Sequence, residues 1–363
     1  MLIYLIIFFI LAITAIEYEI RPFKNNLAVV LIIITLSLLA GFRSPDVARD
    51  YGQYQFAFDN IYDFVQDPSG AYFSVFEPGF VGVSLLFRLL LTHNYGLGVM
   101  IFFALVSLTL KFISIIKLSI NPYLVILIYY SHYFILHEMT QIRIGLASAI
   151  FLFSLLYFLK KNFKAYVALI LLATLFHYSA ILYLLLIPFS SKHFNKYIYS
   201  GVILCSIGLG IAKISFFGYF TSFFISGNAY GKASTYAEVI SYGVTQQINF
   251  FNLINIIKIL GSLYLIYSVP NQHFHTDSKL TLFLKFNIFS LFIFSLFAGE
   301  PFFAFRIGEL FGIVSIFTFA YLAKYLPFEK FNIFFVVLLA LVFFYLNIYK
   351  EDLLKPYEII KIM

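Results

Sequence analysis

The sequence has little charge for its length. Of its 363 residues only 11% are charged, whereas 62% are hydrophobic. A soluble domain is roughly 45–50% apolar and about 25% charged. A water-soluble fold could not bury so much apolar surface, so we expect a polytopic membrane protein. The apolar runs are long and continuous, which predicts spanning helices and not the weak alternation of a membrane β-barrel.

Several chemical features are also missing. The single cysteine, Cys205, lies in an apolar run, so it forms no intrachain disulfide and we expect it to pack among its neighbours. No acidic pair and no His/Cys cluster has the spacing of a metal site. No Gly-rich phosphate loop or nucleotide fold is visible. We therefore predict no metal and no cofactor, and no use of ATP or nucleotide sugars.

The net charge of +7 does not predict a nucleic-acid partner. The lysines gather at the ends of apolar runs, where they fix membrane topology. No basic stretch interleaved with aromatic residues resembles a nucleic-acid module.

The apolar segments predict an all-α fold with about 11–13 transmembrane or re-entrant helices. No internal repeat, low-complexity linker or soluble domain interrupts them, so residues 1–363 are predicted to form a single membrane domain. The first segment lacks a basic n-region and a cleavage site, which favours a retained helix over a signal peptide. The segments lie at about 2–16, 27–42, 78–91, 96–116, 122–138, 142–159, 165–189, 197–218, 249–269, 280–298, 303–323 and 331–348.

Lysine-rich loops set the predicted topology. The positive-inside rule places in the cytoplasm the loops 160–164, 190–196, 271–279 and 324–330. Segment 165–189 lies between two of these loops, so we expect it to enter and return as two half-helices that turn near 176–180. The stretches predicted to be extracytoplasmic loops are about 43–77, 219–248 and 298–306.

Loop 43–77 reaches the outer side only if segment 78–91 does not cross. That segment is short, follows Glu77-Pro78-Gly79 and contains Arg88, which favours a re-entrant or interfacial helix.

Charge inside an apolar run is costly, and four places with ionisable residues stand out, of which Arg143 and His177 are the first two. Arg143 opens a helix beside Gln141, and its alternative role is a snorkelling side chain at the interface. His177 lies in the middle of "LLATLFHYSAILYLLL", at the expected break and close to the Ser179 hydroxyl. A broken helix at membrane depth is tolerated where its backbone lines a cavity. The alternative for His177 is a hydrogen-bonded core residue.

Two further places carry charge beside apolar runs. Arg306 and Glu309 are three residues apart on one predicted helix, so they could simply pair. Glu300 precedes Pro301 at the start of that helix, where a carboxylate suits the helix dipole.

The stretch "AGFRSPDVARDYGQY" at 40–54 is the second of these places. Arg43 is either an interface anchor or part of a site. Asp50 could belong to a solvated loop, and Tyr51 and Tyr54 could be aromatics of the membrane interface.

Three arginines and one histidine on one membrane face would form an anion site with an acid/base candidate. The fixed fork of donors on an arginine suits phosphate. A phosphorylated lipid in the bilayer fits this pattern.

Several motifs resemble the EpsG-like, Wzy-type polysaccharide polymerases. "GFRSPDVARDYGQYQFAF" is similar to the early motif of that family, and "FEPGFVGVSLLFRLL" to the Glu-Pro/Gly-Phe segment that follows it. The most specific resemblance lies in 139–188, with an Ile-Arg-x-x-x-Ala helix, a basic loop and Phe-His-x-Ser-Ala. The helix of Arg306 is similar to the late part of the family. Where the family often has Gln after the helix arginine, this chain has Ile144.

The resemblance implies a bacterial inner-membrane glycosyltransferase of GT-C-like architecture. Such an enzyme transfers a growing glycan from undecaprenyl pyrophosphate onto a lipid-linked repeat unit at the periplasmic or outer face. A flippase and a chain-length regulator are the expected protein partners, and the substrates are undecaprenyl-pyrophosphate-linked oligosaccharides and membrane lipid. The expected catalytic residues are His177 as first choice of base, Asp50 and Glu77 as its alternatives, and Arg143. The expected substrate-binding residues are Arg43, Arg306, Tyr51, Tyr54, Gln141, Ser179 and Glu300.

Two rival functions use the same residues. A flippase of the lipid-linked unit would also need arginines for pyrophosphate, although transporters tend to show internal repeats and this chain has none. A membrane acyltransferase could use His177 on an acyl donor.

Overall fold

The computed structural model describes residues 1–23, 25–66, 76–91, 93–213, 249–299 and 301–360. Within these ranges the chain is helical, and its β-structure is limited to isolated bridges that pair Arg43 with Ile359 and Ala48 with Leu354. The predicted all-α class is confirmed. Loop 219–248 lies outside the described residues, and so does Glu300.

The chain folds into two compact units. The first comprises Met1–Val65, Pro78–Leu185 and Phe319–Met363, and the second comprises Gln66–Glu77 and Leu186–Thr318. Each unit is described by itself below.

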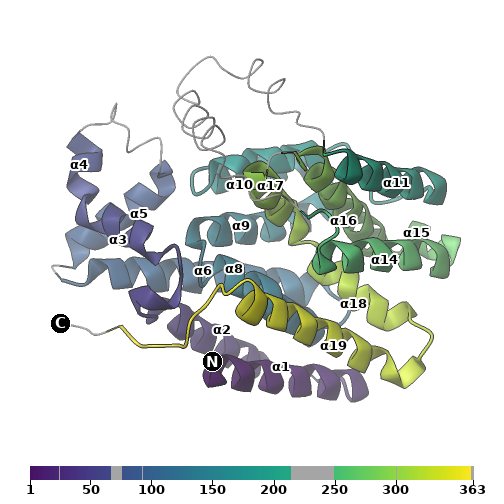
Figure 1. Ribbon diagram of the computed structural model, residues 1–363, viewed down its shortest axis with the longest axis horizontal. Coiled ribbons are helices and arrows are strands. Elements are labelled where there is room, and N and C mark those ends of the chain that lie inside the picture. The colour runs from purple at the N-terminus through teal and green to yellow at the C-terminus, as the bar shows by residue number, and fades with distance from the viewer. Residues whose placement is uncertain (24, 67–75, 92, 214–248, 300, 361–363) are drawn as a thin grey trace, which may run out of the picture. The chain divides into compact units, whose positions relative to one another are not determined.

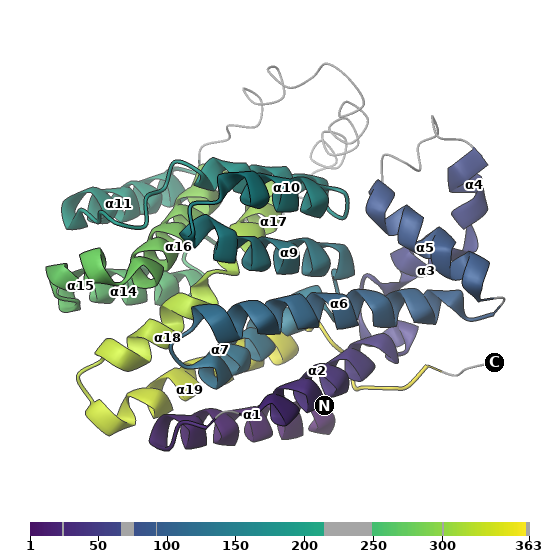
Figure 2. The same ribbon diagram turned by 180° about the vertical axis from the view of Figure 1, so that it is seen from behind.

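The first unit is organised around one long helix. α6 packs against α9 on one side and α2 on the other, and it lies between them in both views (Figure 1, Figure 2). α1 packs against α7 and α19. The elements are α1 (Leu2–Ile20), α2 (Asn26–Gly41), η1 (Pro45–Val47), α3 (Tyr51–Asp59), α4 (Ile61–Gln66), α5 (Pro78–Leu90), α6 (Tyr95–Leu118), α7 (Pro122–Tyr129), the π-helix η2 (Tyr130–Phe134), α8 (Ile135–His137), α9 (Ile142–Leu159), α10 (Phe163–Thr174), η3 (Tyr178–Leu186), η4 (Glu329–Phe331), α19 (Asn332–Tyr345) and η5 (Leu346–Lys350). The helix α18 (Ser315–Tyr325) is divided between the units, and its residues from Phe319 onward belong to the first.

The second unit is built around α16, which contacts α11, α14, α15 and α17. Cys205 lies on α11 and is exposed, so the expectation that it packs among neighbours is wrong. An apolar helix at the edge of a membrane protein can direct such a side chain outward. The elements are α11 (Lys196–Ala212), α14 (Leu253–Ser268), α15 (Asn271–Thr276), α16 (Ser278–Leu296) and α17 (Pro301–Gly312).

Short polar side chains begin many of these helices. The side chains of Asn121 and Asn162 accept hydrogen bonds from backbone amides in the first turns of α7 and α10, and Asp277 does the same for α16. Such caps satisfy amides that have no partner within the helix.

The protein is a multi-pass membrane protein. Among the described residues, five helices are long and apolar enough to span a membrane, and the bent pair α17–α18 raises the number to six. The five are α1, α6, α9, α16 and the continuous segment Asn332–Lys350. Other apolar helices, such as α2, α5 and α10, have 10–17 residues. The total of about 11–13 transmembrane or re-entrant helices stays a prediction.

Segments 165–189 and 78–91 are both expected not to form a single straight span. α10 ends at Thr174 and η3 begins at Tyr178, so segment 165–189 is broken at His177 as predicted. The second half is a 3₁₀-helix, not an α-helix. α5 has 13 residues, fewer than a straight span requires, which agrees with a segment that does not cross.

Candidate functional site

The break before His177 is held by the start of α5. The backbone amide of Gly79 donates to the carbonyl oxygen of Leu175 at 2.8 Å. A Cβ atom at Gly79 would lie 2.7 Å from that oxygen, so only glycine allows this approach. Phe176 packs edge-on against Phe103 of α6, with 5.9 Å between ring centroids. His177 is half-buried, and its Nε2 lies 2.9 Å from the Ser179 hydroxyl, which confirms Ser179 as its neighbour.

Arg143, at the start of α9, lies over the side chain of Tyr54. Its guanidinium carbon is 5.8 Å from the centroid of the Tyr54 ring. Burial raises the pKa of the Tyr54 hydroxyl, while Arg143 opposes that rise and Asp50 adds to it. The Tyr54 hydroxyl is therefore neutral near neutral pH.

Aromatic rings connect this arginine to the break at His177. The guanidinium of Arg143 is 6.0 Å from the centroid of Phe80 on α5. Phe80 in turn contacts Phe103 at 5.7 Å, and Phe103 contacts Phe176. Elements that are far apart in sequence thus bring Tyr54, Arg143 and the residue before His177 onto one aromatic layer of the first unit.

Arg43 has no exposed surface, so the alternative of an exposed interface anchor is wrong. Its guanidinium donates to the carbonyl oxygen of Ala40, and Nη2 lies 4.0 Å from the sulfur of Met100. The guanidinium carbon is 5.5 Å from the centroid of the Tyr51 ring. Burial lowers the pKa of Arg43, but arginine starts so high that it stays charged.

Within the described ranges the charge of Arg43 lacks a counter-charge. In the described part of the chain no carboxylate forms an ion pair with it, and its Nε has no hydrogen-bond partner. A buried charge is costly unless it is paired. This arginine is therefore an anion-binding candidate on physical grounds as well as on sequence pattern.

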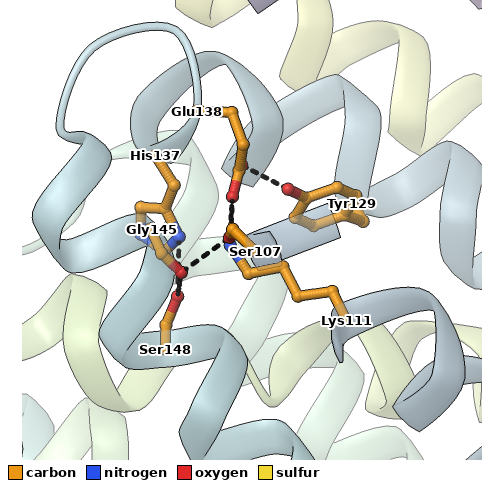
Figure 3. Close-up of polar contacts among 7 residues, drawn as sticks. All are labelled: Ser107, Lys111, Tyr129, His137, Glu138, Gly145 and Ser148. Atoms are coloured by element: carbon orange, nitrogen blue, oxygen red, sulfur yellow. Dashed lines mark hydrogen bonds and ion pairs between the residues drawn. The ribbon is translucent and has the colours of Figure 1, made fainter. Parts of the chain in front are cut away.

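A buried ion pair that the sequence analysis did not find lies beside the start of α9 (Figure 3). Lys111 of α6 and Glu138 are 2.5 Å apart, and both are buried. Ser107 donates to the same carboxylate at 2.6 Å, and the Tyr129 hydroxyl donates to its other oxygen. The carboxylate is thus hydrogen-bonded on both oxygens, which a buried charge requires. Lys111 lies inside the apolar segment 96–116, and an ionisable residue in such a segment is the sequence feature that would have marked it as a candidate.

The same cluster fixes the first turn of α9. Ser148 donates to the carbonyl oxygen of Gly145 at 2.9 Å, and the Ser107 hydroxyl, which donates to Glu138, lies 3.0 Å from the same carbonyl oxygen (Figure 3). Nδ1 of His137 is 3.2 Å from the Ser148 hydroxyl. A Cβ atom on Gly145 would lie 3.2 Å from the Glu138 carboxylate, so this glycine permits the helix to pack closely there. The turn that carries Arg143 is therefore tied to α6 and to the preceding loop.

The remaining predicted site residues occupy varied surroundings. Tyr51 and Tyr54 are buried and are not surface aromatics. Glu77 is buried. Gln141 precedes α9, and its buried Oε1 has no hydrogen-bond partner among the described residues.

Asp46 and Arg49 are exposed and Asp50 is half-buried. Arg306 is exposed on α17 and belongs to the second unit, whereas Arg43, Arg143 and His177 belong to the first. The predicted site with three arginines therefore stays a prediction.

The arrangement in the first unit suits two chemical tasks. A guanidinium that is fixed in a dry environment binds anionic oxygens strongly, because it needs no reorganisation. A half-buried histidine at a helix break can accept a proton near neutral pH.

Comparisons with known proteins add one finding. The family model described as EpsG family matches residues 26–359 of the chain. Neither the curated proteins nor the solved structures gave a match.

Proposed function

The chain belongs to the EpsG family, and from that premise we propose that it is a polysaccharide polymerase. Membership of this family indicates a role in polysaccharide biosynthesis. The proposed enzyme is a nucleotide-sugar-independent glycosyltransferase of GT-C-like architecture in the bacterial inner membrane. It transfers a growing glycan from undecaprenyl pyrophosphate onto a lipid-linked repeat unit at the outer face.

One observation carries the proposal. Two arginines, Arg43 and Arg143, lie over two neighbouring buried rings of α3, Tyr51 and Tyr54 respectively, in the unit that also holds His177. Arg43 has no ion-pair partner in the described chain, and Arg143 is half-buried. A lipid pyrophosphate would supply the missing negative charge.

The reaction needs two kinds of help. The bond between the sugar C1 and the pyrophosphate oxygen breaks, and undecaprenyl pyrophosphate leaves with the electron pair. A hydroxyl oxygen of the acceptor sugar forms the new bond to C1 and loses its proton to a base. In the proposal Arg43 and Arg143 stabilise the charge that develops on the leaving group. His177 accepts the proton, with Asp50 and Glu77 as alternative acceptors.

The remaining candidates take supporting roles in this proposal. Arg306 is a further cation for the pyrophosphate, and Tyr51 and Tyr54 form walls against the sugar. Gln141, Ser179 and Glu300 are hydrogen-bonding groups for the substrate. The Ser179 hydroxyl lies 2.9 Å from Nε2 of the proposed base.

The test replaces the proposed base. His177→Ala should lower chain extension by about 10²–10⁴-fold, because that is the usual contribution of a positioned acid or base. The readout is the ladder of surface polysaccharide on a gel, with the amount of protein in the membrane measured in parallel. His93→Ala, which changes an exposed histidine of the same unit, is the control. Long chains from His177→Ala at normal protein level would rule out an essential base at this position.

A deletion strain separates the proposal from its rivals. Loss of the ladder while a single repeat unit is still exported indicates a polymerase. Accumulation of units inside the cell indicates a flippase. A full ladder with altered mass indicates an acyltransferase.

A further inference from the structure

A short extended segment follows the last helices and pairs with the connection between α2 and α3. This segment, Leu353–Ile360, is called the strap, and its yellow trace leaves the end of α19 in Figure 1. The amide of Lys355 donates to Val47, the amide of Ser44 donates to Glu358, and the amide of Ile360 donates to Phe42, all to carbonyl oxygens. These bonds measure 2.8–3.0 Å.

The strap is centred on Arg43. The bonds from Ser44 and to Phe42 lie on either side of Arg43, which itself bridges to Ile359. Tyr357 of the strap packs edge-on against Tyr4 of α1, with 6.1 Å between ring centroids. Tyr4 and Tyr357 both interact electrostatically with the Arg43 guanidinium. The guanidinium is thus enclosed by tyrosines from the strap, α1 and α3.

Two buried polar atoms in this enclosure have no partner among the described residues. They are Nε of Arg43 and the hydroxyl of Tyr4. Both can donate a hydrogen bond, and one belongs to a cation without a counter-charge. Buried polar atoms are almost always satisfied, so exceptions point to a missing ligand or to stored strain. An oxygen anion would satisfy both donors and neutralise the charge.

The neighbouring surface indicates that the anion belongs to a lipid. Leu31, Ile34 and Leu38 have the spacing of one face of α2, and all three are exposed. That helix ends at Gly41, just before Arg43. A prenyl chain lying against this apolar face would place its phosphate near the guanidinium.

We propose that the strap is part of the substrate site and closes over a phosphoryl group bound at Arg43, with Tyr357 as a positioning residue. Arg43 has no exposed surface, so a ligand reaches it only after a covering element moves. A few backbone hydrogen bonds at an exposed edge open more readily than packed helices do. This inference rests on the proposed function, because it names a further part of the same pyrophosphate site.

The experiment measures binding of a short-chain prenyl pyrophosphate to the purified full-length protein in detergent, with inorganic pyrophosphate as a second probe. Removal of the strap from Leu353 onward should weaken binding of the prenyl pyrophosphate by at least about tenfold. Ile360→Pro should also weaken it, because proline cannot donate the hydrogen bond to Phe42. Tighter binding of the prenyl probe than of inorganic pyrophosphate identifies the lipid as the source of the phosphate.

Matched variants separate positioning from general destabilisation. Tyr357→Ala should weaken binding more than Tyr357→Phe, because phenylalanine keeps the ring against Tyr4. Ile360→Ala keeps the amide and should weaken binding less than Ile360→Pro. Tyr349→Phe, which changes an exposed tyrosine outside the strap, should bind as the wild type does. Thermal unfolding without probe confirms that each variant is folded.

The outcomes distinguish the strap from the polymerase. Wild-type affinity in the folded Ile360→Pro and Tyr357→Ala variants would overturn the strap, as would a wild-type protein that binds neither probe. Strap-dependent binding by a protein that makes no polymer would leave the strap in place and refute the polymerase. Normal ladders from the strap variants, with probe binding unchanged, would refute the role of the strap and leave the polymerase in place.

Discussion

Lys111 and Glu138 form a buried ion pair in a protein that has few charged residues. Removing one partner leaves the other charge buried and unpaired, and measured costs of such changes are about 3–5 kcal/mol. We therefore expect Lys111→Met to lower the thermal stability of the detergent-solubilised protein strongly. Lys117→Met, at an exposed position of the same helix, should change it little. Equal melting temperatures for the two variants would contradict this reading of the pair.

Replacing the whole cluster tests what the pair does for Arg143. A combined Lys111→Met, Tyr129→Phe and Glu138→Leu variant removes both charges and the hydroxyl that would lose its acceptor. Because apolar replacement of a complete buried pair is often neutral, stability should largely recover. Polymer synthesis should stay low if the cluster positions the first turn of α9. If synthesis recovers together with stability, the cluster stabilises the fold and does not position Arg143.

Arg143→Lys tests the chemistry of the cation itself. Lysine keeps the charge but loses the planar fork that binds two oxygens at once. We expect chain extension to fall by about 10²-fold, the order found when one fixed donor to a developing anion is lost. Arg49→Lys, at an exposed position, provides the control. Ladders of normal length from Arg143→Lys would show that a point charge is sufficient.

At the level of elements, the contact between α5 and the break before His177 depends on one glycine. Gly79→Ala would place a methyl group against the carbonyl oxygen of Leu175, whereas nothing lies within 4 Å of a Cβ atom at Gly82 on the same helix. We expect Gly79→Ala to destabilise the protein by about 1–3 kcal/mol, the usual cost of overpacking. Gly82→Ala should leave the melting temperature unchanged or slightly raised. A similar shift for both variants would indicate that α5 does not pack tightly at the break.

The sequence located most elements because hydrophobic periodicity is a local property. Each of the twelve apolar segments contains a helix, and the break near His177 followed from the lysines on either side. The 3₁₀ geometry of η3 and the π-helix η2 did not follow, because they depend on hydrogen bonds that shift by one residue without a change in composition. The strap was also missed, since its pairing joins residues that are far apart in the chain.

The candidate site was predicted less completely than the fold. Arg43, Arg143 and His177 were found because ionisable residues beside or within apolar runs are rare and costly. Glu138 was not identified, although it is buried beside Lys111 of α6. Which charges meet is decided by helix packing, and sequence alone does not specify that.

For the whole molecule, the open question with the greatest consequence is the side of the membrane that residues 43–77 face. A single cysteine introduced as Asn60→Cys into a Cys205→Ser background answers it, because the exposed native cysteine must be absent. We expect an impermeant maleimide to label this variant from outside intact cells. A cysteine placed by the same method in the lysine-rich loop 160–164 should react only after the cells are opened. Labelling of residue 60 only from the cytoplasm would overturn the proposed topology.

The unpaired charge of Arg43 also bears on how long the protein survives in a cell. A ligand that binds the folded state alone stabilises it by an amount that grows with its concentration. If lipid pyrophosphate fills the enclosure of Arg43, supply of precursor governs the lifetime of the protein as well as the rate of its reaction. Cells starved of precursor would then clear idle copies by proteolysis, without a dedicated regulator.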